Sequence, residues 1–282
     1  MFCSEDCELK KIKFFERDIV KKFTQILAIT LSIFSTVMIF ISLPSAVVKL
    51  IVGLSVLTLH IGIYIGVWIY WNKKKEVTIK IRNTNIIIKE GDIFKEKGLK
   101  ILPFNEYFDT TVDDIVIAKS SLNGIFIDNY VKDVEELDKY IADSLYDIKS
   151  EKVASRKNAK NVKYELGTMV KYDEYLLLAY SKFDSENKAY LNKEDIAPLY
   201  MKMWSEIDKY KAGNCVNIPV LGSSRIVRNA LSAYSYQQMM ELILWSFRVS
   251  DVDFCRESTL NIIVHSSLAK EINFLKLLYY SD

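Results

Sequence analysis

Two long apolar runs near the N-terminus constrain the fold of this chain more than any other feature. Residues 23–43 and residues 50–70 contain no Asp, Glu, Lys or Arg, and only residues 44–49 separate them. An α-helix rises about 1.5 Å per residue, so each run is long enough to cross a hydrocarbon core of about 30 Å. We therefore expect residues 23–71 to form a transmembrane hairpin of two helices.

Basic residues on both sides of the hairpin predict its orientation. Positive charge near the ends of membrane spans stays on the cytoplasmic side. The loop between the runs carries only Lys49, whereas the outer flanks are strongly basic. The flanking residues are Lys10, Lys11, Lys13, Arg17, Lys21 and Lys22 before the first run and Lys73, Lys74, Lys75, Lys80 and Arg82 after the second. We expect a multi-pass protein of the cell inner membrane with both termini cytoplasmic, residues 1–22 being a basic cytoplasmic segment.

The apolar runs have two alternative interpretations. The first run could be the core of a signal peptide, but it is long, starts late and is followed at once by a second run. Both runs could instead be buried helices of a soluble fold, although their uniform hydrophobicity and basic flanks argue against it. The membrane hairpin accounts for all of these features together.

A few small or polar residues interrupt the two runs. Gly62 and Gly66 have the G-x-x-x-G spacing that lets membrane helices approach closely, either inside the hairpin or between chains. His60 is the one residue within the second run whose side chain ordinarily titrates near neutral pH. It is either functional or, as we expect, neutral and hydrogen-bonded to a neighbouring Ser or Thr.

Residues 76–282 have the composition of an ordinary globular domain. A formal net charge of +2 for the chain gives no reason to expect a nucleic-acid partner. Cys3, Cys7, Cys215 and Cys255 are too scattered for a disulfide framework or a zinc site, so we expect no metal and a reducing compartment.

Apolar patterns in this region alternate between strand and helix periods. We expect strands at residues 77–81, 86–88, 99–102, 116–118, 164–170, 175–180, 216–221 and 260–265, and helices at 134–148, 196–210, 239–247 and 268–280. Such alternation predicts one α/β domain with a mostly parallel or mixed sheet between helix layers. Sheets of this kind bind ligands beyond the carboxyl ends of their strands.

Two loops that follow expected strands carry residues suited to a nucleotide. Asp92, after Gly91, can accept a hydrogen bond from an exocyclic amine such as that of adenine. The second loop is Gly222-Ser223-Ser224-Arg225, whose backbone N–H groups can cradle a diphosphate while the arginine adds positive charge.

The order of these motifs resembles a macro domain, the ADP-ribose-binding α/β/α fold. In detail it resembles the macro domain of the membrane-spanning effectors of type II Thoeris anti-phage systems, which the N-terminal hairpin also matches. The segments that carry the resemblance are Gly91-Asp92-Ile93-Phe94, Leu102 to Thr110, Ser120 to Gly124, Leu166-Gly167-Thr168, Ser181 to Asp184 and Pro219-Val220-Leu221-Gly222-Ser223.

The resemblance implies a three-layer α/β/α macro-like domain with a mixed sheet over residues 76–282, and a set of ligand contacts. Asp92 and Ile93 would contact adenine, and Asn105, Glu106 and Asp109 would lie near the distal ribose. The two phosphate loops would be formed by Ser121, Leu122, Asn123 and Gly124 and by Leu221, Gly222, Ser223, Ser224 and Arg225. The chain departs from the general macro pattern at the distal ribose, where Pro103-Phe104-Asn105-Glu106 stands, and in both phosphate loops. These departures argue against ordinary ADP-ribose hydrolysis.

The function that the resemblance implies is that of an effector without a cofactor. A partner TIR-domain enzyme would make histidine-ADP-ribose, the domain would bind it and self-associate, and the hairpins would disrupt the lipid bilayer, causing abortive infection. A membrane-anchored ADP-ribosyl or nucleotide hydrolase is the alternative, with catalysis resting on Asn105, Asp109 and a water. A passive membrane scaffold, which would bind no nucleotide, is a third.

Overall fold

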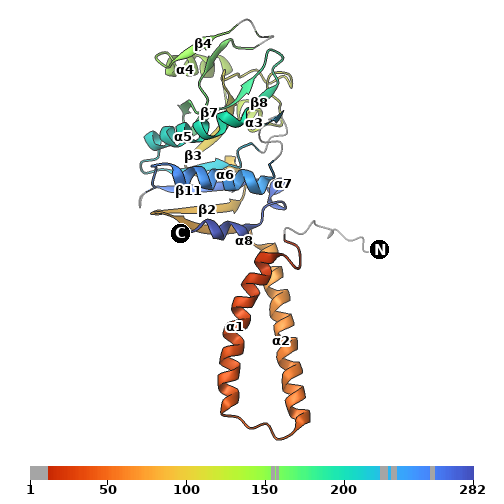
Figure 1. Cartoon of the computed structure of the whole chain (residues 1–282). Coiled ribbons are helices and arrows are strands. Elements are labelled where there is room, and N and C mark those ends of the chain that lie inside the picture. The colour runs from red at the N-terminus through yellow and green to blue at the C-terminus, as the bar shows by residue number, and fades with distance from the viewer. Residues whose placement is uncertain (1–11, 154–155, 157–158, 223–227, 230–233, 255–257) are drawn as a thin grey trace, which may run out of the picture. The chain divides into compact units, whose positions relative to one another are not determined.

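The computed structural model describes residues 12–153, 156, 159–222, 228–229, 234–254 and 258–282, which form two compact units (Figure 1). The hairpin unit comprises the chain up to Val77 together with Asn273–Tyr279. The sheet unit comprises Thr78–Ile272 and Tyr280–Asp282.

The hairpin unit contains two long antiparallel helices, as the apolar runs predict (Figure 1). Helix α1 spans Arg17–Ile39 and helix α2 spans Ala46–Lys73. The Ser45 side chain caps α2 by accepting a hydrogen bond from the Val48 N–H. In the most apolar stretch of α1 0 % of the residues are buried, and in that of α2 6 %. Neither helix is therefore the core of a soluble fold in this structure.

A polar contact joins the two helices of the hairpin. The Thr30 hydroxyl lies 2.9 Å from His60 Nε2, and His60 Nδ1 lies 2.7 Å from the Val56 carbonyl oxygen. The expected pairing of His60 with a Ser or Thr is thus confirmed. At Gly62 and Gly66 a Cβ atom would meet nothing within 4 Å. Packing inside the hairpin therefore does not require their small size.

The described strands form a mixed sheet, in agreement with the predicted fold class. Nine of them make one sheet with the order β1-β2-β11-β9-β3-β7-β8-β10, and β6 also pairs with β7. Neighbours from β2 to β7 run parallel, whereas β6 and β8 are antiparallel to β7. The strands are β1 (Glu76–Ile81), β2 (Thr84–Glu90), β3 (Leu99–Asn105), β6 (Met169–Tyr172), β7 (Tyr175–Phe183), β8 (Ala189–Leu191), β9 (Cys215–Pro219), β10 (Arg228–Asn229) and β11 (Thr259–Val264), with β4 (Ser150–Lys152) and β5 (Val162–Tyr164) as a separate pair.

Helices cover both faces of this sheet. Successive side chains of a strand point to opposite faces, and β7 uses both for packing. Leu177 and Ala179 join a buried cluster with residues of α3 (Leu122–Tyr130) and α4 (Val134–Ser144). On the other face Tyr180 meets Tyr200 of α5 (Lys193–Tyr210), with ring centroids 6.4 Å apart. Helix α6 (Tyr236–Val249) packs on α5, completing three layers.

Local capping explains where the structure differs from the pattern-based expectations. The strand expected at 116–118 is wrong. The Asp113 and Asp114 side chains accept hydrogen bonds from backbone N–H groups of this segment, so that a single bridge between Val112 and Ile117 is its only sheet-like pairing. The single helix expected at 268–280 is also wrong. It is broken into α7 (Ser266–Ala269), α8 (Phe274–Leu277) and the 3-10 turn Leu278–Tyr280, because Asn273 caps a new helix.

Three further differences concern the middle of the chain. The strand expected at 164–170 is divided into β5 and β6, which a turn at Gly167 with a φ of 87° separates. Helix α3 falls in a segment for which no helix was expected. The expected helix at 134–148 ends at Ser144.

Candidate functional site

A cavity of about 700 Å³ opens where β2, β11, β9, β3 and β7 end. These strands are parallel, so their carboxyl ends meet at one edge of the sheet. The volume lies in the range of sites that enclose a small organic ligand. This edge is also where sheets of this type bind ligands.

The wall at the end of β2 contains Asp92 and Ile93. Asp92 Oδ1 accepts a hydrogen bond from the Phe94 N–H at 3.1 Å, which fixes the direction of the side chain. Asp92 Oδ2 lies 3.8 Å from Lys95 Nζ, beyond hydrogen-bond distance, and the carboxylate is 42 % exposed. One carboxylate oxygen can therefore accept a hydrogen bond from a ligand amine.

The N-terminus of α3 forms a second wall. Ser121 caps the helix by accepting a hydrogen bond from the Gly124 N–H at 3.0 Å, and Leu122 and Asn123 line the cavity beside it. A Cβ at Gly124 would stand 2.3 Å from the Ala118 carbonyl oxygen, so only glycine permits this approach. The first N–H groups of a helix and its positive end suit an anion such as a phosphate.

The loop after β9 forms a third wall. Leu221 and Gly222 line the cavity, and Gly222 has a φ of 81°, a conformation that favours glycine. Ser223, Ser224 and Arg225, the rest of the predicted phosphate loop, lie outside the described residues. The structure thus brings Asp92, the α3 N-terminus and Gly222 to one cavity.

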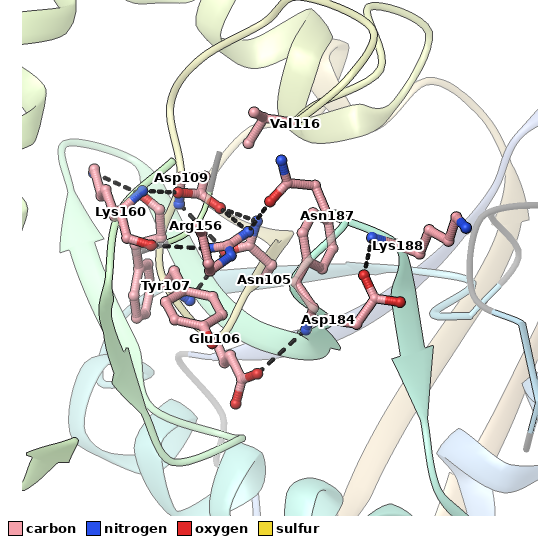
Figure 2. A network of polar contacts seen from close by, with 12 residues as sticks. Asn105, Glu106, Tyr107, Asp109, Val116, Arg156, Lys160, Asp184, Asn187 and Lys188 are labelled. Atoms are coloured by element: carbon pink, nitrogen blue, oxygen red, sulfur yellow. Dashed lines mark hydrogen bonds and ion pairs between the residues drawn. The ribbon is translucent and has the colours of Figure 1, made fainter. Parts of the chain in front are cut away.

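The three residues predicted near a distal ribose divide into two groups (Figure 2). Asn105 lines the cavity, whereas Glu106 and Asp109 do not. Glu106 Oε1 accepts the Phe183 N–H at 3.2 Å. Both oxygens of Asp109 are engaged: Oδ1 accepts the Lys160 N–H, and Oδ2 accepts Asn105 Nδ2 at 3.0 Å. These two carboxylates therefore hold the wall of the cavity together.

A buried arginine that sequence reasoning missed stands at the centre of this network (Figure 2). Arg156 Nη2 lies 3.0 Å from Asp109 Oδ2 and donates to Asn187 Oδ1 at 2.7 Å. Its guanidinium carbon lies 3.8 Å from the centre of the Tyr107 ring. Arg156 belongs to the basic segment of residues 152–163, whose composition does not indicate burial, and only the fold shows that its side chain is buried.

Comparison with known proteins identifies the family. A model of the macro domain of the Thoeris protein ThsA matches residues 86–265. The chain belongs to the Thoeris ThsA family. A Thoeris protein ThsA from Bacillus amyloliquefaciens (strain Y2) is 35 % identical over 258 residues, which cover 89 % of this chain and 86 % of that relative.

Solved macrodomain structures also match, at low sequence identity. The Oceanobacillus iheyensis macrodomain with ADP is 12 % identical and gives a TM-score of 0.45, with 72 % of this chain and 95 % of that chain covered. A glycine-to-valine variant of the same macrodomain with ADPR is 11 % identical, with a TM-score of 0.45 and coverage of 72 % and 97 %. The family match, which spans most of the sheet unit, is what establishes the macro domain and the link to Thoeris defence.

Several residues of this ThsA-family cavity were not anticipated from the sequence. Tyr180, Asn187 and His265 line it from β7, from the turn after β7 and from the end of β11. Burial raises the pKa of the Tyr180 phenol well above its usual value, and the neighbouring Tyr200 adds to the effect, so Tyr180 stays neutral. Asn187 and His265 each follow a strand that ends at the cavity, and this position is the one sequence signal that could have predicted them.

The described residues offer no metal site in this ThsA-family chain. Among them, no group of three or more His, Cys, Asp or Glu side chains is arranged to hold a metal ion. The polar groups at the cavity are hydrogen-bonding side chains and a helix N-terminus, which are suited to an anionic polar ligand.

Proposed function

We propose that this protein is a membrane-anchored anti-phage effector that senses an ADP-ribose-derived signal. Its macro domain binds histidine-ADP-ribose made by a TIR-domain enzyme and then self-associates. The hairpins of the assembled chains disrupt the bilayer, which arrests the infected cell. Membership of the ThsA family supports the defence role, and the chemistry below supports the ligand.

The main support for this proposal is that three walls with different hydrogen-bonding groups line one cavity. Asp92 offers an acceptor for an amine, the α3 N-terminus offers backbone donors for a phosphate, and Gly222 lines the cavity beyond them. β2 and β7 are four steps apart in the sheet, and strands lie about 4.8 Å apart, so the cavity edge extends over roughly 19 Å. An extended nucleoside diphosphate with a second sugar fits such a length.

The geometry gives little support to the hydrolase alternative. A general base must reach the proton of an attacking water, but both oxygens of Asp109 already accept hydrogen bonds inside the wall. Asn105 Oδ1 likewise accepts the N–H groups of Tyr107 and Asp109. A sensor, in contrast, needs only a fixed binding surface.

The membrane arrangement is part of the proposal. Two helices long and apolar enough to cross a bilayer expose most of their apolar side chains, which favours a lipid environment. The basic flanks favour cytoplasmic termini, so the macro domain would face the compartment in which a TIR-domain enzyme makes the signal. A ligand that binds the assembled state more tightly shifts the population towards it.

Calorimetry on the full chain in lipid nanodiscs tests the proposal. Histidine-ADP-ribose and ADP-ribose are titrated against the protein and against Asp92→Ala and Gly222→Glu variants. We expect binding of the conjugate without turnover, weakened at least tenfold by each variant. Absence of binding by both compounds would reject the proposed ligand, and steady release of hydrolysis products would favour the hydrolase.

A further inference from the structure

A second cavity, of about 330 Å³, lies within the hairpin unit at the end where α1 begins and α2 ends. Its volume is at the lower end of the range for sites that hold small organic molecules. We call it the hairpin groove; it is lined by Lys22 and Ile26 of α1 and by Gly66, Val67, Tyr70 and Trp71 of α2. All of these residues belong to the hairpin unit, and none of them lines the cavity at the edge of the sheet.

The hairpin groove has a polar rim and an apolar floor. Lys22 and Ile26 are four residues apart in α1, as Gly66 and Tyr70 are in α2, so each pair lies on one face of its helix. A helix rises about 1.5 Å per residue, so Ile26 and Gly66 lie about 6 Å further along the helices than the rim residues Lys22 and Tyr70. In the proposed membrane arrangement the rim lies near the cytoplasmic surface and the floor points towards the hydrocarbon core.

Gly66 leaves the floor of the hairpin groove open. A Cβ atom at Gly66 would meet nothing within 4 Å, so no other described residue fills the space beside it. Ile26 and Val67 are partly buried and provide apolar walls. Inside a bilayer such a space is filled by lipid tails, which are as apolar as these side chains. The floor therefore suits an acyl chain.

The rim offers positive charge and a hydroxyl donor. The Lys22 ammonium forms no hydrogen bond or ion pair with any residue that the structure describes. Lys74 Nζ donates to the Tyr70 hydroxyl oxygen at 2.8 Å and lies 5.0 Å from the centre of the Tyr70 ring. Because the Tyr70 oxygen accepts this hydrogen bond, the hydroxyl hydrogen remains available to a ligand. A phosphate at the rim would meet Lys22 and the Tyr70 hydroxyl, and Lys74 would add positive charge.

We propose that the hairpin groove binds one anionic phospholipid, with its phosphate at Lys22 and Tyr70 and one acyl chain beside Gly66. A zwitterionic head group carries a cation of its own, which competes with the lysines for the phosphate, so the site prefers a head group with a net negative charge. The inference goes beyond the nucleotide signal. It rests only on the part of the proposed function that places the hairpin in a bilayer.

Native mass spectrometry of the full chain in detergent tests the inference. Phosphatidylglycerol and phosphatidylcholine with the same acyl chains are titrated in parallel. We expect the first phosphatidylglycerol to bind at least about tenfold more tightly than the first phosphatidylcholine, which corresponds to about 1.4 kcal/mol or more. Excess glycerol phosphate should not displace the lipid, because it lacks the acyl chain. Displacement would show a site for a free anion and overturn the inference.

Gly66→Leu is the variant that fills the floor. Because its Cβ meets no neighbour, the change should leave the hairpin intact while lowering the affinity for phosphatidylglycerol about tenfold. Gly53→Leu is the matched control, since Gly53 is equally open in the same helix but lies outside the hairpin groove. It should bind lipid like the wild type. If Gly66→Leu abolishes cross-linked dimers and leaves lipid binding unchanged, the floor packs against a second copy and the inference is wrong.

Lys22→Gln tests the rim. It should remove most of the preference for phosphatidylglycerol, whereas Lys13→Gln, the same loss of charge at an exposed position outside the hairpin groove, should keep it. Equal effects of the two changes would indicate general surface attraction and overturn the inference, as would equal affinity of the wild type for both lipids. Either result would leave the proposed function intact. Binding of neither lipid would overturn the membrane arrangement, and this inference with it.

Discussion

The two units of this protein place their apolar side chains in opposite ways. In the sheet unit, Leu137 of α4 is 0 % exposed and belongs to a closed cluster between helices and sheet. In the hairpin unit, Leu57 of α2 is 57 % exposed, like most of its apolar neighbours. The sheet unit buries its apolar side chains in a core of its own, whereas the many exposed apolar side chains of the hairpin favour an apolar surrounding. The same residue type therefore has a different role in each unit.

The largest expected effect is a difference between two matched leucine truncations. Leu137→Ala removes a fully buried side chain and should lower the free energy of unfolding of the sheet unit by about 2–5 kcal/mol. Leu57→Ala should change it by less than about 0.5 kcal/mol, because that side chain lies outside any protein core. Thermal and denaturant unfolding of the full chain in nanodiscs, followed by near-ultraviolet circular dichroism, measures both. Similar losses in the two variants would contradict the comparison.

A charge placed on the hairpin should affect membrane insertion and leave the fold of the sheet unit unchanged. Leu57→Arg is expected to raise the free energy of insertion of α2 by about 2.5–3.5 kcal/mol, the cost of an arginine near the centre of a span. A glycosylation-based insertion assay with microsomes reports the inserted fraction. If Leu57→Arg inserts as well as the wild type, α2 does not cross the bilayer as proposed.

The polar contact inside the hairpin should contribute only modestly. Thr30→Val keeps the shape but removes the hydroxyl that faces His60, and side-chain hydrogen bonds between membrane helices average about 0.6 kcal/mol. We expect a correspondingly small decrease in hairpin stability in detergent titrations. The neighbouring Thr36→Val serves as a control, because Thr36 bonds only to its own helix at the Ser32 carbonyl oxygen.

The smallest expected effect is a pH dependence of the sheet unit. Burial raises the pKa of the Glu106 carboxyl above its ordinary value, so the folded state binds this proton more tightly than the unfolded state. Glu106 therefore contributes less stability as the pH rises through its folded-state pKa. Glu106→Gln should melt at a higher temperature than the wild type at about pH 7.5, and the difference should shrink as the pH falls towards about 4.3, the ordinary pKa of glutamate. A constant difference at all pH values would contradict this assignment.

Much of the fold could be predicted from the sequence because its apolar patterns are long and regular. The two hairpin helices and the buried strands β2, β7 and β11 are examples. Elements set by short side-chain caps escaped prediction. Asp113 and Asp114 replaced an expected strand by turns, and Asn273 divided an expected helix. Such local hydrogen bonds outweigh apolar periodicity over a few residues.

The candidate site likewise contains residues that the sequence could predict and one that it could not. Asp92 and Gly222 could be placed because each follows an apolar strand that ends at the cavity. Arg156 could not, because its partners Asp109 and Asn187 are distant in the sequence and only the fold brings the three together. The ligand contacts of Asp92 and Gly222 stay predictions, which titration of their variants tests.

The central claim is that ligand binding to the macro domain makes the hairpins disrupt a bilayer, and dye release from liposomes tests it most directly. The full chain is reconstituted at low density into vesicles loaded with a self-quenching dye, and histidine-ADP-ribose is then added. We predict dye release that depends on the ligand, is lost in Asp92→Ala, and is reduced by Leu57→Arg in the hairpin. Ligand binding without any dye release would contradict the account, as would equal release in the absence of ligand.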